Sequence, residues 1–129
     1  MSLADTSLAL ANACDHLSEW ITGLRNGANW QETDDQGAKL DQVQSSLGDE
    51  ADALRTAGVS ALLEGSTAAL NQINSAVTQI QTLNQQIAQF NQIVSLVTTV
   101  VALAGNAASG NLSGIVNGAV SVISQIQKL

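Results

Sequence analysis

The chain has 129 residues, of which 45% are hydrophobic and 2% aromatic, with no proline and a formal net charge of −7. This length suits one domain with a modest core. Sheet proteins usually need Pro- and Gly-marked turns and aromatic or Thr-rich strands, so the composition predicts an all-α fold. The four basic residues form no cluster, which argues against binding to nucleic acid.

The charges are distributed unevenly along the acidic chain. Residues 1–64 contain all of the acidic residues, whereas residues 65–127 contain no Asp, Glu, Lys or Arg. We therefore divide the single structural domain into an acidic N-terminal helical hairpin, residues 1–64, and a charge-free C-terminal helical hairpin, residues 65–129. The acidic half is expected to keep the second half soluble.

The N-terminus and the cysteine content bear on localisation. The first residues lack the basic and apolar regions of a Sec-type signal peptide, so we expect the chain to be cytoplasmic at synthesis. Export without such a signal, or membrane association, stays open. The single cysteine, Cys14, cannot form an internal disulfide, and no oxidising compartment is implied.

Two helices are predicted in the acidic half. The first spans about residues 2–25, because apolar or small side chains recur at steps of four and three, and Ser2 with Asp5 is typical of an N-cap pair. The second begins at the capping-box sequence Thr33-Asp34-Asp35-Gln36 and is expected to reach residue 61. Residues 46–49 could break it. Residues 64–66 are typical of the end of one helix followed by the N-cap of the next. Without this break, the second and third helices would form one long helix.

The stretch 69–104 carries the most regular pattern in the chain. Apolar residues alternate at steps of four and three for about five heptads, without Gly or Pro, which predicts one continuous helix facing a partner helix. Asn, Gln, Ser and Thr occupy the flanking positions, where ordinary coiled coils use charges to choose a partner. We expect an assembly seam made of Ile73, Ile80, Leu83, Ile87, Phe90, Val94, Val97 and Val101.

A turn of small residues at 105–110 is predicted to lead into a fourth helix from about residue 111. Its seam is expected at Leu112, Ile115, Ala119, Val122, Ile126 and Leu129. Gly110, Gly114 and Gly118 form a GxxxGxxxG glycine zipper on one flank, a spacing that lets helix backbones approach closely.

Two interpretations of these glycines stay open. Either the fourth helix packs tightly on the third within a soluble bundle, or residues 93–104 and 112–126 form a membrane-inserting hairpin. Each arm of that hairpin is shorter than the ~20 residues that span a bilayer.

The long uncharged amphipathic helix with its terminal hydrophobic hairpin resembles subunits of helical pore-forming toxins, and it also resembles small secreted helical-hairpin proteins. The first resemblance implies a membrane-active subunit. The chain contains no Trp-x-Gly turn and no motif specific to either group, so we assign it to neither.

Cys14-Asp15-His16 with Glu19 is the cluster that most suggests chemistry. A carboxylate–histidine metal site needs a matching motif on a second helix, and the sequence offers none. Cys14 lies on the apolar seam of its helix, and His16 points elsewhere. The acidic residues at 32–35 do not have the spacing of a calcium loop. We predict no catalytic, metal or cofactor-binding residues, and a protein that is not an enzyme.

The predicted fold is therefore an elongated antiparallel all-α bundle or coiled coil that ends in a hydrophobic helical hairpin. The predicted function is self-assembly, or binding of a partner helix, through the uncharged seam. The alternative is a pore-forming-type subunit that inserts its glycine-zipper hairpin into a membrane. No small-molecule substrate is evident from the sequence.

Overall fold

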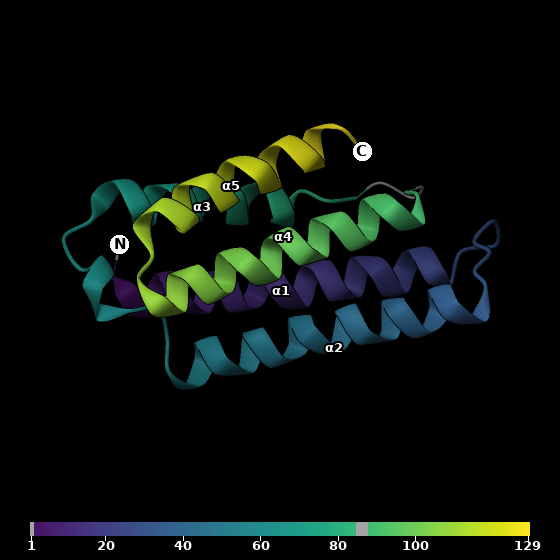
Figure 1. Ribbon diagram of the computed structural model, residues 1–129, viewed down its shortest axis with the longest axis horizontal. Coiled ribbons are helices and arrows are strands. Elements are labelled where there is room, and N and C mark those ends of the chain that lie inside the picture. The colour runs from purple at the N-terminus through teal and green to yellow at the C-terminus, as the bar shows by residue number, and fades with distance from the viewer. Residues whose placement is uncertain (1, 85–87) are drawn as a thin grey trace.

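The computed structural model describes residues 2–84 and 88–129, and within these ranges the chain forms five α-helices and one short 3-10 helix (Figure 1). The predicted all-α fold is confirmed. The helices are α1 (Leu3–Arg25), α2 (Asp34–Thr56), α3 (Thr67–Gln81), α4 (Phe90–Ser109) and α5 (Leu112–Gln127), and the 3-10 helix is η1 (Ala61–Leu63).

The helices pack as a bundle in which each has two main neighbours. α1 lies between α2 and α3, α5 lies between α3 and α4, and α4 also packs on α2. In Figure 1, α2 and α5 lie at opposite edges of the molecule, with α1 and α4 between them. The acidic helix α2 is therefore separated from the uncharged helix α5 by the bundle itself.

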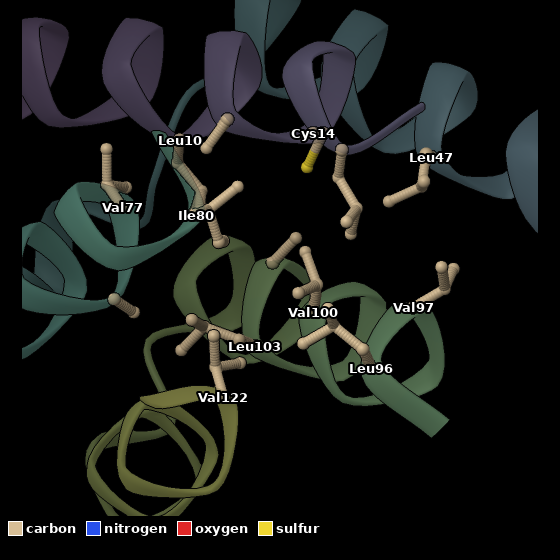
Figure 2. Close-up of a cluster of buried hydrophobic side chains, with 14 of the residues drawn as sticks. Leu10, Cys14, Leu47, Val77, Ile80, Leu96, Val97, Val100, Leu103 and Val122 are labelled. Carbon is tan, nitrogen blue, oxygen red and sulfur yellow. The ribbon is translucent and has the colours of Figure 1, made fainter. Parts of the chain in front are cut away.

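The core is made of aliphatic side chains from several helices. Leu10 and Cys14 of α1, Ile80 of α3, Leu103 of α4 and Val122 of α5 are all fully buried and converge in the same cluster (Figure 2). Burying one such aliphatic side chain contributes about 1.5–3 kcal/mol. The packing of uncharged helices on α1 thus joins the two halves of the chain in one core.

The predicted starts of the first two helices are confirmed. The Ser2 hydroxyl accepts a hydrogen bond from the Asp5 N–H at 3.1 Å. At the start of α2, Thr33 Oγ1 accepts from the Gln36 N–H at 3.1 Å, and Gln36 Oε1 accepts from the Thr33 N–H at 3.0 Å. Both N-capping patterns can be recognised in the sequence because each involves residues only three positions apart.

Two expectations for the second helix are wrong. α2 continues through Gly48 without a break, since Leu47 and Ala51 beside it are buried and their packing outweighs the ~1 kcal/mol cost of one helical glycine. The helix also ends at Thr56, before the predicted residue 61, and the chain turns at Gly58 and Gly65, both with positive φ. These turns exclude a single rod made of α2 and α3.

The predicted continuous helix over residues 69–104 is also wrong, because α3 ends at Gln81 and α4 begins at Phe90. The Thr82 hydroxyl closes α3 by donating to the Gln79 carbonyl at 2.7 Å. As one helix, residues 69–104 would extend ~54 Å, whereas α1 and α2, with 23 residues each, extend only ~35 Å. Because the helix is divided, both parts of the apolar seam can be buried against other helices of the same chain.

The turn predicted at 105–110 is much shorter in the structure. α4 runs through Gly105 to Ser109, and Gly110, with φ 79°, ends it in the left-handed conformation. The Asn111 side chain then caps α5 by accepting from the Gly114 N–H at 3.0 Å. The helix continues because Ala107, one turn beyond Ala104, is still fully buried.

Charged groups of the acidic half are paired on the α1–α2 side. Arg25 donates to Glu32 through Nε and Nη2, both at 2.9 Å, and to Asp41 at 2.7 Å. Trp30 Nε1 donates to the same Glu32 carboxylate at 2.8 Å, so the loop folds back on the bundle. The hydrogen bonds from Arg25 and Trp30 lower the pKa of Glu32 below its ordinary value.

Candidate association surface

Cys14 is not placed for chemistry. Its free thiol is fully buried in the core. Burial raises the pKa of Cys14 to about 12, and the nearby Glu50 and Asp15 carboxylates add to this effect. Because the thiolate is the nucleophile, a thiol with this pKa is inert near neutral pH.

The polar neighbours of Cys14 have structural partners. Asp15 forms an ion pair with Arg55 that joins α1 to α2. His16 Nε2 lies 3.4 Å from the carbonyl oxygen of Leu83, just after α3. Within residues 2–84 and 88–129, no three His, Cys, Asp or Glu side chains are grouped to hold a metal ion.

A hollow of about 420 Å³ lies where the start of α1 meets the residues after α2. Its walls include Leu3, Leu8 and Leu54, and its charged lining residue, Arg55, is the one that pairs with Asp15. No His, Asp or Glu is among the lining residues that the structure describes.

Most of the predicted assembly seam lies inside the chain's own core. Ile73, Ile80, Leu83 and Val97 are at most 5% exposed, Phe90, Val94 and Val101 are half-buried, and Ile87 lies outside the described residues. The partners of the buried seam side chains are other helices of the same chain. In this fold the buried seam side chains stabilise the bundle.

The three glycines of the predicted zipper do not share one helix, which corrects the sequence interpretation. Gly110 ends α4, whereas Gly114 and Gly118 lie on α5. A Cβ built at Gly114 would lie 2.5 Å from Asn106 Nδ2, and one at Gly118 would lie 3.5 Å from Leu103 Cβ. The last two glycines therefore allow close approach between α5 and α4 of the same chain.

An exposed apolar row, here called the α5 stripe, runs along the outer side of α5. It consists of Leu112, Val116 and Val120, which are 48%, 38% and 56% exposed. Residues four apart lie one above another on a helix, so the three side chains form one row. The buried face of α5 is made of Ile115, Ala119, Val122 and Ile126.

The surroundings of the α5 stripe are uncharged. Ser113, Asn117 and Ser121 are exposed beside it, and the whole segment 65–127 lacks charged residues. Leu62, which is 74% exposed, lies against Gly110 at the connection from which α5 begins. Large exposed apolar groups gathered in this way mark interaction sites more often than scattered ones do.

Sequence reasoning missed this surface. It assigned Leu112 to the buried seam, and it singled out neither Val116 nor Val120. The available signal was the spacing of these two valines, four apart and off the seam, on a short helix that also had a complete apolar face.

The length and hydropathy of α4 bear on the membrane interpretation. Among the helices in the described part of the chain, it alone is long and apolar enough to cross a membrane. It has 20 residues, and an 18-residue window within it has a mean hydropathy of 1.4 and is 39% buried. Its buried side chains include Leu96, Val100 and Leu103. A core helix of a bundle has the same composition.

Comparison of the chain with protein-family models, with curated proteins and with solved structures found no match.

Proposed function

We propose that this protein is not an enzyme and that it acts by self-association through the uncharged surface of its C-terminal half. The observation that carries the proposal is the α5 stripe, an exposed apolar row inside a segment without charged residues, 65–127. The helix that carries it, α5, lies at the edge of the bundle opposite the acidic helix α2 (Figure 1).

The charge distribution favours a second copy of the chain as the partner. Two molecules with a net charge of −7 repel each other where their acidic halves meet, and contact through the uncharged halves keeps those charges apart. A charged partner surface would lose water at this interface without gaining an ion pair. The same uncharged surface on another copy keeps the acidic halves apart and brings no unpaired charge into the interface.

We further propose that the bundle is an elongated antiparallel one, with coiled-coil-like packing between paired helices. The short connection between α4 and α5, Gly110 and Asn111, supports this arrangement, because short connections join antiparallel neighbours.

Wild-type protein is expected to change from monomer to dimer as its concentration rises through the micromolar range. Light scattering during size-exclusion chromatography, or analytical ultracentrifugation, measures this directly. Added salt should leave the dimer unchanged or strengthen it slightly, since salt screens the repulsion between acidic halves and has no interfacial ion pairs to weaken. A monomer at all concentrations up to several hundred micromolar would contradict the proposal.

A second candidate function, membrane insertion, is favoured by the length and composition of α4. For insertion, α4 would have to leave its contacts with α2 and α5, which exposes Leu96, Val100 and Leu103. We expect the folded protein neither to float with vesicles of neutral or anionic lipid nor to release a trapped dye at neutral pH. Flotation together with dye release would favour the membrane function over self-association in water.

A further inference from the structure

We propose that two copies pack their α5 stripes against each other around a two-fold axis that passes beside Val116. This inference rests on the self-association proposed above and names the contact that produces it. The partner is a second copy of this chain, and the contact is made by the outer face of α5.

The arrangement follows from the symmetry of the stripe. In a two-fold interface, if one residue contacts a second, the second contacts the first on the other copy. Val116 lies midway between Leu112 and Val120 in a row with equal spacing. With the two α5 helices antiparallel, Val116 lies opposite Val116, and Leu112 of each copy lies opposite Val120 of the other.

The flanking residues suit the same geometry. Ser113 and Ser121 are small and exposed, so they leave room for two helices to approach. Asn117, exposed beside Val116, carries an amide that can both donate and accept hydrogen bonds. Across the two-fold axis, it can hydrogen-bond to Asn117 of the other copy. None of these groups needs a counter-charge.

The size of the stripe sets the expected affinity. A stable interface usually buries about 800 Å² on each partner. One face of α5 is ~24 Å long for its 16 residues and ~10 Å wide, so its footprint is well below that area. We therefore expect a dimer that dissociates in the micromolar range.

Cysteine cross-linking tests the position of the axis. A disulfide forms only when two Cα atoms come within about 7 Å, so Val116→Cys should give a covalent dimer under mild oxidation. The natural Cys14 is the chain's only cysteine and is buried, which leaves the new thiol as the accessible one. The matched control is Ser45→Cys, exposed on α2 at the opposite edge of the bundle, which should cross-link at least tenfold more slowly.

A charge at the axis provides the second readout. Val116→Glu places two carboxylates opposite each other and should weaken the dimer at least tenfold in dissociation constant, whereas Ser45→Glu should leave it unchanged. Circular dichroism checks that both variants stay folded. Val120→Glu is the second variant at the stripe and is expected to act like Val116→Glu.

The outcomes separate the contact from the proposed function. A wild-type dimer, fast cross-linking of Val116→Cys and a weakened Val116→Glu dimer support the α5 contact. A wild-type dimer with cross-linking no faster than Ser45→Cys, and with Val116→Glu and Val120→Glu still dimeric, overturns the α5 contact and leaves self-association standing. A wild-type monomer at every concentration overturns both.

Discussion

Ile80→Asp is expected to lower the free energy of unfolding by more than ~4 kcal/mol, a large part of the 5–15 kcal/mol typical of a domain. Ile80 is fully buried, in the same core cluster as Leu10 of α1 (Figure 2). Its own half of the chain has no basic residue before Lys128 that could pair with a carboxylate. Urea unfolding followed by circular dichroism measures the loss.

The pH dependence of this variant has a definite sign. Burial raises the pKa of an aspartate, because the charged form loses its hydration. The folded variant therefore binds a proton more tightly than the unfolded chain does, and its stability is lost as the pH rises from acid to neutral. Ile80→Asp should be less destabilising at pH 4 than at pH 7.

Ser75→Asp is the matched control. Ser75 is exposed on the same helix, so the same new charge should cost less than ~0.5 kcal/mol. Equal urea midpoints for the two variants would mean that the buried face of α3 has been assigned wrongly.

The sequence predicted the features that depend on neighbouring residues. The Ser2 cap and the Thr33–Gln36 capping box each depend on residues three positions apart, and both are present. The division between α3 and α4 has no such local signal. The apolar steps of four and three continue across it without Gly or Pro, so the division is seen only in the structure, where α3 packs on α1 and α5 and α4 packs on α2 and α5.

The lack of a local signal also explains why residues of the predicted assembly seam are buried within the chain. A heptad pattern indicates that a face is covered, but it does not say whether the covering helix belongs to the same chain. Ile73, Ile80 and Val97 were expected to meet a partner, and they are buried within the bundle. The spacing of Val116 and Val120 indicates a second apolar row on α5, and the packing of α5 on α3 and α4 leaves that row exposed.

Gly110→Ala is expected to lower the free energy of unfolding by ~2–5 kcal/mol. Gly110 has φ 79°, and the left-handed conformation costs other residues ~1–2 kcal/mol. A Cβ there would also lie 2.8 Å from Ser60 Oγ and 3.0 Å from Leu62 Cβ. Crowding of this kind adds ~1–3 kcal/mol where neighbours cannot move away.

Gly105→Ala is the matched control, five residues earlier and within α4. Nothing lies within 4 Å of a Cβ built at Gly105, and alanine is the better helix former by up to ~1 kcal/mol. The two alanine variants should therefore change stability in opposite directions, with Gly105→Ala unfolding at a higher urea concentration than the wild type and Gly110→Ala at a lower one. Destabilisation by both variants to the same extent would contradict a helix that runs through Gly105 and ends at Gly110. The turn that directs α5, and with it the α5 stripe, depends on a glycine that alanine cannot replace without strain.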